Sequence, residues 1–105
     1  MTDLTIRIEG AGAERTVHLE GTCDLATVPE LRQALMPLGP PDVTRLVVNV
    51  SQLEFCDSTG LGTILGALRR LREGGGEFAI AGAQGTVLRL LEITGLDRVV
   101  PLLDA

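Results

Sequence analysis

A short polar segment holds the residue types best suited to chemistry. Asp57, Ser58 and Thr59 follow one another directly before an apolar pattern of helical spacing, so all three stand where a helix is predicted to begin. A serine can act as a nucleophile or accept a phosphoryl group. An aspartate at a helix start can accept hydrogen bonds from free backbone amides. The segment therefore suits nucleophilic catalysis, covalent modification or simple helix capping.

Nucleophilic catalysis would need a base beside Ser58. The single histidine, His18, lies in a predicted strand on the face opposite its apolar neighbours, which favours a solvated side chain over a general base. All nine basic residues are arginine, so no lysine can replace the histidine, and the residues around Ser58 lack the G-x-S-x-G elbow. We therefore predict that the protein is not an enzyme and that Ser58 is a group to be modified.

Three glycines in the helical segment after Ser58 require an explanation. Each of Gly60, Gly62 and Gly66 would destabilise a helix by roughly 0.5 to 1 kcal/mol relative to alanine. We predict that Gly60 bares the backbone beside Ser58, and that Gly62 and Gly66 share a face that packs closely on a sheet. A dinucleotide-binding fingerprint is excluded, because its third glycine would fall where Leu65 stands.

A second acidic turn, from Gly21 to Asp24, follows an earlier predicted strand. If that strand runs parallel to the one before Asp57, Asp24 and Asp57 lie at the same end of the sheet and flank Ser58. A turn or capping role for Asp24 is an equally open alternative. Two carboxylates without a histidine make a poor metal site, so we expect no metal or other cofactor. Cys23 and Cys56 are predicted to be buried, reduced thiols with no chemistry.

The composition narrows the class of partner. The 105 residues predict one domain spanning 1–105. Fourteen acidic against nine basic residues give a formal charge of −5, and with only two aromatic residues this argues against nucleic acid. No apolar run approaches the ~18 residues of a membrane span, so we expect no membrane contact and a cytoplasmic location. A protein or small molecule is the expected partner.

Apolar periodicity places the elements that must position these residues. Alternation of period two indicates strands, and apolar steps of three and four residues indicate helices. The expected elements are strands at 4–8 and 16–20, a helix at 25–38, a strand at 46–50, a helix at 61–71, a strand at 78–81, a helix at 87–93 and a strand at 99–102. Alternating strands and helices imply parallel pairing. The predicted class is α/β, a mixed sheet with an opening antiparallel hairpin followed by parallel strands and packed helices.

Local signals define several of these elements further. Thr27 and Glu30 have capping-box spacing at the first helix. The nearly unbroken apolar run at 46–50 predicts a central strand covered on both faces. Thr86 is the expected cap of the last helix, and Gly95 its left-handed stop.

The string FCDSTGLGTIL, with LVVNVSQLE before it and LEITGLDRVV near the end, resembles the bacterial anti-sigma factor antagonists of the STAS domain family. The resemblance implies a STAS-like fold and phosphorylation of the serine after the aspartate, here Ser58, by a kinase that is itself the anti-sigma factor. A serine phosphatase would reverse the modification, and ATP and Mg would be bound by the kinase. Asp24 resembles the aspartate of the family's Gly-Glu-Leu-Asp turn, although Thr22 and Cys23 depart from it. The implied partner-binding residues are Asp24, Asp57, Ser58, Thr59, Gly60, Leu61 and Gly62.

The resemblance implies regulation of transcription by partner switching. The unphosphorylated protein would bind the anti-sigma factor and release its sigma factor, and phosphorylation at Ser58 would switch this binding off. The alternative is a non-switching STAS interaction module in a signalling assembly or beside a transporter. Many relatives continue into a further helix that this sequence lacks, which would leave one face open to a partner or to a second copy. The identity of the partner and the oligomeric state stay open.

Overall fold

The computed structural model describes residues 3–104 as a sheet and the helices that cover it. In chain order, the elements are β1 (Leu4–Glu9), β2 (Glu14–Cys23), α1 (Val28–Leu35), β3 (Arg45–Cys56), α2 (Ser58–Glu73), β4 (Glu77–Ala81), α3 (Gly85–Thr94), the 3-10 turn η1 (Leu96–Arg98) and β5 (Leu102–Leu103). The strand and helix order expected from apolar periodicity is confirmed.

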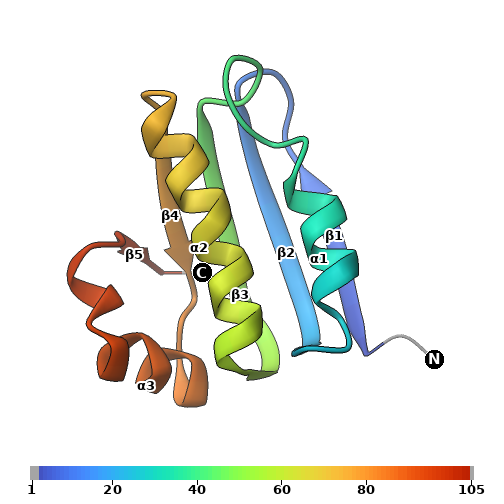
Figure 1. The fold of residues 1–105 in the computed structure, drawn as a ribbon, viewed down its shortest axis with the longest axis vertical. Coiled ribbons are helices and arrows are strands. Elements are labelled where there is room, and N and C mark those ends of the chain that lie inside the picture. The colour runs from blue at the N-terminus through green and yellow to red at the C-terminus, as the bar shows by residue number, and fades with distance from the viewer. Residues whose placement is uncertain (1–2, 105) are drawn as a thin grey trace.

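The strands are arranged in the order β1-β2-β3-β4-β5, with β3 in the middle (Figure 1). β1 pairs with β2 in antiparallel fashion, whereas β2, β3, β4 and β5 are parallel neighbours. The predicted mixed sheet with an opening hairpin is therefore confirmed. β2 to β5 can run parallel because helices connect them. A parallel pair needs such a crossover to return the chain to the same end of the sheet.

The helices cover one face of this sheet. α1 and α2 lie side by side across it (Figure 1), and apolar residues of α3 join the same core. Along β3, burial alternates: Val48 and Val50 are buried, whereas Val47 and Asn49, which point to the other face, are only half-buried. The prediction that this strand is covered on both faces is therefore wrong. Valine is common on half-exposed strand faces as well as in cores. Because Val47 is apolar, the sequence does not show the alternation of buried and half-exposed residues along β3.

The start of α1 differs from the prediction. The helix begins at Val28, and Leu25 lies before it in a turn with 72% of its surface exposed. Thr27 precedes the helix, but its hydroxyl accepts a hydrogen bond from the Asp24 amide at 2.9 Å and donates one to the Thr22 carbonyl at 3.0 Å. The hydroxyl is thus occupied by the preceding turn, and the capping box with Glu30 does not form.

The last helix is longer than the predicted 87–93, and the last strand is shorter than the predicted 99–102. α3 begins at Gly85 after Gln84, so Thr86 lies inside the helix and is not its cap. Gly95 has a φ of 77° and ends the helix in the left-handed conformation, as predicted. Only Leu102–Leu103 pair with β4. Of the helices described between residues 3 and 104, none combines the length and apolar character needed to cross a membrane.

Candidate functional site

β2 and β3 end side by side, and the candidate site lies just beyond their ends. Cys23 and Cys56 are partners in the parallel register, and the Asp57 amide donates a hydrogen bond to the Cys23 carbonyl at 3.1 Å. The residue after each cysteine is an aspartate. The prediction that Asp24 and Asp57 lie at the same end of the sheet is therefore confirmed.

Asp57 caps the helix that carries Ser58. Its Oδ1 accepts a hydrogen bond from the Gly60 amide at 2.9 Å, which satisfies one of the free donors of the first turn. Ser58 is the first residue of α2 and is exposed, as is Thr59. The capping role proposed for this segment thus belongs to Asp57, and Ser58 stands on the surface at the positive end of a 16-residue helix.

Asp24 holds the neighbouring turn in shape. Its Oδ1 accepts hydrogen bonds from the amides of Ala26 at 3.0 Å and Thr27 at 3.2 Å, the geometry of an aspartate turn. The turn role left open by the sequence is therefore confirmed. Asp24 is half-buried and lies at the same end of the sheet as the start of α2.

Gly60 is buried, which corrects the prediction that it bares the backbone beside Ser58. A Cβ on Gly60 would lie 2.5 Å from Cys23 Sγ and 2.7 Å from the Cys23 carbonyl oxygen. The glycine thus permits close approach between α2 and the end of β2. Leu61 is also buried and belongs to the core. The structure therefore places Gly60 and Leu61 beneath the surface, where they hold the first turn of α2 in place.

Gly62 and Gly66 have the open surroundings that were expected for Gly60. Among the described residues and outside their own stretch of α2, no heavy atom lies within 4 Å of a Cβ built on either glycine, so the prediction that they pack closely on the sheet is wrong. They line a hollow of about 280 Å³ between α1 and α2, together with Thr59 and Arg32. Their four-residue spacing does put them on one side of α2, but that side faces α1 rather than the sheet.

Two exposed apolar side chains flank the polar segment and were not identified as site residues from the sequence. Leu25 follows Asp24 directly, and Phe55, which is 48% exposed, precedes Cys56 near the end of β3. Apolar periodicity assigned Leu25 to the buried face of a helix. The sequence signal that could have identified these two residues as part of the site is their position, because Leu25 follows Asp24 directly and Phe55 lies two residues before Asp57.

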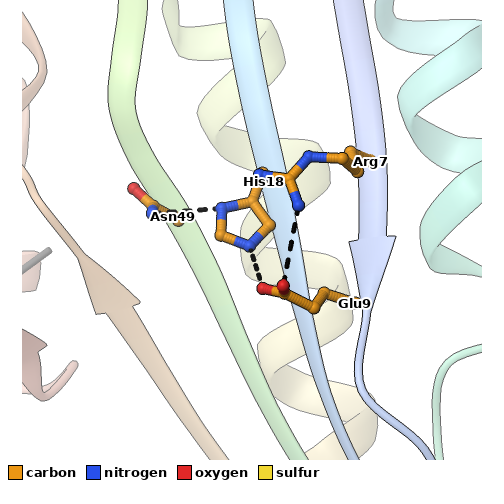
Figure 2. A network of polar contacts seen from close by, with 4 residues as sticks. All are labelled: Arg7, Glu9, His18 and Asn49. Carbon is orange, nitrogen blue, oxygen red and sulfur yellow. Dashed lines mark hydrogen bonds and ion pairs between the residues drawn. The ribbon is translucent and has the colours of Figure 1, made fainter.

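His18 lies on the open face of the sheet, away from α2. Its Nε2 is 2.8 Å from Glu9 Oε1, and its Nδ1 is 3.2 Å from the side-chain nitrogen of Asn49 (Figure 2). Arg7 adds an ion pair to Glu9 at 3.7 Å. The hydrogen bond and the charge of His18, together with Arg7, lower the pKa of the Glu9 carboxyl. His18 is thus bound into a polar network between strands and is not positioned as a base for Ser58.

The cysteines are buried, free thiols, as predicted. Cys23 is completely covered, and Cys56 retains 6% of its exposure. Within residues 3–104, no group of three or more histidine, cysteine, aspartate or glutamate side chains has the arrangement of a metal site.

The chain is similar in sequence to known proteins. The family model described as "Mlab, STAS domain" matches residues 6–104. An anti-sigma-B factor antagonist of Staphylococcus aureus is 39% identical over 80 residues, which cover 76% of this chain and 74% of that protein. The corresponding protein of Staphylococcus epidermidis is 36% identical over the same length.

Solved structures show the same fold. The crystal structure of an anti-sigma factor antagonist from Mycobacterium paratuberculosis aligns with a TM-score of 0.83 at 30% identity, over 95% of this chain and 85% of that one. The phosphorylated form of the Bacillus cell fate determinant SpoIIAA aligns with a TM-score of 0.75 at 24% identity, over 96% and 91%, and supports the fold alone. The chain therefore belongs to the STAS domain family, among relatives named as bacterial anti-sigma factor antagonists.

Proposed function

We propose that this protein is an anti-sigma factor antagonist that is switched by phosphorylation of Ser58. In the unphosphorylated form it binds an anti-sigma factor with serine kinase activity, and the sigma factor held by that partner is released to direct transcription. The observation that carries the proposal is the exposed Ser58 at the start of α2, beside the turn that carries Asp24. The names of the Staphylococcus and Mycobacterium relatives support the choice of partner.

The partner would bind a docking surface formed by seven residues that the structure leaves accessible, fully or in part: Asp24, Leu25, Phe55, Asp57, Ser58, Thr59 and Gly62. Apolar side chains beside charged ones are typical of protein interfaces, in which buried apolar contacts supply affinity and the polar rim supplies orientation. Leu25 and Phe55 are exposed enough to supply the apolar contacts. Gly60 and Leu61 act beneath this docking surface by fixing the backbone of α2.

Phosphorylation would alter this surface without disturbing the fold. A phosphoryl group adds about 1.5 to 2 negative charges at neutral pH. At the amino terminus of α2, backbone amides and the helix dipole favour an anion, so the domain should remain folded. The new charge stands next to Asp57 and near the turn at Asp24, and a partner matched to the neutral hydroxyl would lose affinity. The switch therefore acts through charge and bulk at the contact itself.

The kinase partner brings ATP and Mg, and a separate serine phosphatase restores the hydroxyl. Both reactions take place in the cytoplasm, where sigma factors act. The chain contains two serines, and the other one, Ser51, is half-buried within β3. The Ser51 amide donates a hydrogen bond to Asn49 Oδ1 at 2.9 Å, and Ser51 lies within β3, five residues before Cys56. Ser51 therefore serves as the matched control for Ser58.

The test is a capture experiment followed by phosphorylation. Wild-type protein should capture a partner that mass spectrometry identifies as an anti-sigma factor with a kinase domain, and so should Ser58→Ala and Ser51→Ala. Ser58→Glu should bind weakly. With the purified partner, ATP and Mg, phosphate should appear on Ser58 within tryptic peptide 46–69 of the wild-type and Ser51→Ala proteins, and not on Ser58→Ala.

Two results would contradict the proposal. If phosphate is placed on Ser51 or Thr59 instead, the acceptor is wrong. If wild-type protein binds its partner equally well before and after phosphorylation, the switch is wrong and a non-switching STAS interaction module is favoured.

A further inference from the structure

Cys23 and Cys56 form a pair of thiols directly beneath the docking surface. They are register partners at the ends of the parallel strands β2 and β3, and both are free. Cys23 Sγ also lies against the first turn of α2, as shown by its 2.5 Å separation from a Cβ built on Gly60. The pair therefore joins the two strand ends that lead into Asp24 and Asp57.

The spacing of the strands suits a disulfide. Neighbouring strands lie about 4.7 to 4.9 Å apart, and the Cα atoms of a disulfide are usually about 4.4 to 6.8 Å apart. Register partners in one pair of strands point to the same face of the sheet, and both cysteines are covered by the helices on that face. The two side chains thus start on one face of neighbouring strands, and bond formation would require their rotation together with a small approach of the two strand ends.

The two thiols are not equivalent. The interaction of the two sulfurs lowers the pKa of Cys56 and raises the pKa of Cys23, whereas burial opposes ionisation of both thiols and the Asp57 charge also opposes ionisation of Cys56. Cys56 also lies two residues before Ser58, near the positive end of α2, where a thiolate is favoured. Cys56 is also the less completely buried of the two residues, with 6% of its surface exposed against none for Cys23.

We propose that Cys23 and Cys56 are a redox modification site that a small hydroperoxide converts reversibly into an intramolecular disulfide. The Cys56 thiolate attacks the peroxide, the O–O bond breaks, and a sulfenic acid forms on Cys56 while hydroxide leaves. The Cys23 sulfur then attacks the Cys56 sulfur and water departs, with the Cys23 proton taken up by the departing oxygen. For hydrogen peroxide, two thiols are oxidised and one peroxide is reduced to two waters. An added dithiol reverses the reaction.

The disulfide would act on the docking surface from below. It would tie together the residues that precede Asp24 and Asp57 and would redirect the Cys23 sulfur that now lies against Gly60. An effect on partner binding rests on the function proposed above, whereas formation of the disulfide does not.

The experiment uses the isolated full chain with hydrogen peroxide, so its outcome is independent of any kinase or partner. Oxidised monomer should lose two hydrogen atoms in mass, and both thiols should resist alkylation after unfolding until a reductant is added. Because trypsin cleaves after arginine, Cys23 and Cys56 fall on separate peptides, 16–32 and 46–69, and the oxidised sample should contain these two joined. Amide signals of Asp57 and Gly60 should shift between the reduced and oxidised folded protein.

Single variants supply the controls. Neither Cys23→Ser nor Cys56→Ser can form the internal bridge, and Cys23→Ser should trap sulfenic acid on Cys56 more readily than Cys56→Ser does on Cys23. Ser58→Ala should oxidise like wild type. The proposal would be overturned if wild-type peptide 46–69 were joined only to a second copy of itself, if both thiols stayed free in excess peroxide, or if the bridge formed only in denaturant.

Discussion

Gly60 provides a sharp test of how α2 is held against the sheet. In Gly60→Ala, the added methyl group would lie 2.5 Å from Cys23 Sγ and 2.7 Å from the Cys23 carbonyl oxygen. The sulfur can rotate away, but the carbonyl belongs to the backbone and accepts the hydrogen bond from the Asp57 amide. The substitution should therefore strain the junction between β2 and α2, beneath the proposed docking surface.

The magnitude follows from two opposing effects. Overpacking at a well-packed position typically destabilises by about 1 to 3 kcal/mol. Replacement of glycine by alanine in a helix returns up to roughly 1 kcal/mol, and less near the helix end. We expect Gly60→Ala to lower the free energy of unfolding by about 1 to 2 kcal/mol, which corresponds to a fall in Tm of roughly 4 to 8 °C for a domain of this size.

Gly66 on the same helix is the matched control. Outside its own stretch of α2, the described residues place no heavy atom within 4 Å of a Cβ built on Gly66, so Gly66→Ala meets no steric obstacle there. Only the greater helix propensity of alanine over glycine then changes the stability. We expect the free energy of unfolding to rise by about 0.5 to 1 kcal/mol, which corresponds to a rise in Tm of roughly 2 to 4 °C. Urea unfolding followed by circular dichroism measures both variants. If Gly60→Ala matched the wild type, or if both substitutions shifted stability in the same direction, the assigned contacts would be wrong.

Two further predictions concern single carboxylates. Asp57→Ala removes the acceptor for the Gly60 amide and should lower the free energy of unfolding by about 1 kcal/mol. Asp57→Asn keeps a capping oxygen and should lower it much less. Equal decreases in urea unfolding would refute the capping role. The Glu9 carboxyl, whose pKa is lowered from 4.5 by the hydrogen bond and charge of His18 and then by Arg7, should titrate below 4.5 by NMR, and His18→Gln should raise that midpoint. Because the folded pKa is depressed, the ionised carboxylate contributes stability above its unfolded pKa, and this contribution is lost as pH falls through the folded value. An unchanged midpoint in His18→Gln would rule out His18 as the cause.

Local patterns in the sequence were sufficient to predict which elements form and in what order. Alternating apolar residues identify β1 and β2, and helical spacing identifies α2, because one face of each element must be buried in any compact fold. The order of strands and helices also implied that Asp24 and Asp57 lie at one end of the sheet, since β2 and β3 must run parallel when a helix connects them. The Asp57-Ser58 motif needed no structure to be noticed.

Tertiary structure decided which surface each residue meets. Glycines at 60, 62 and 66 look alike in sequence, yet only Gly60 touches a backbone from another element, because the distance between α2 and β2 is set by packing and not by helical spacing. Leu25 satisfied an apolar helical pattern but lies in a turn, because the hydrogen bonds of Asp24 and Thr27 delay the start of α1. Cys23 and Cys56 are 33 positions apart along the chain and become neighbours only through the register of β2 and β3. Sequence alone thus determined the elements and placed Ser58 among them, while contacts between distant segments determined what surrounds it.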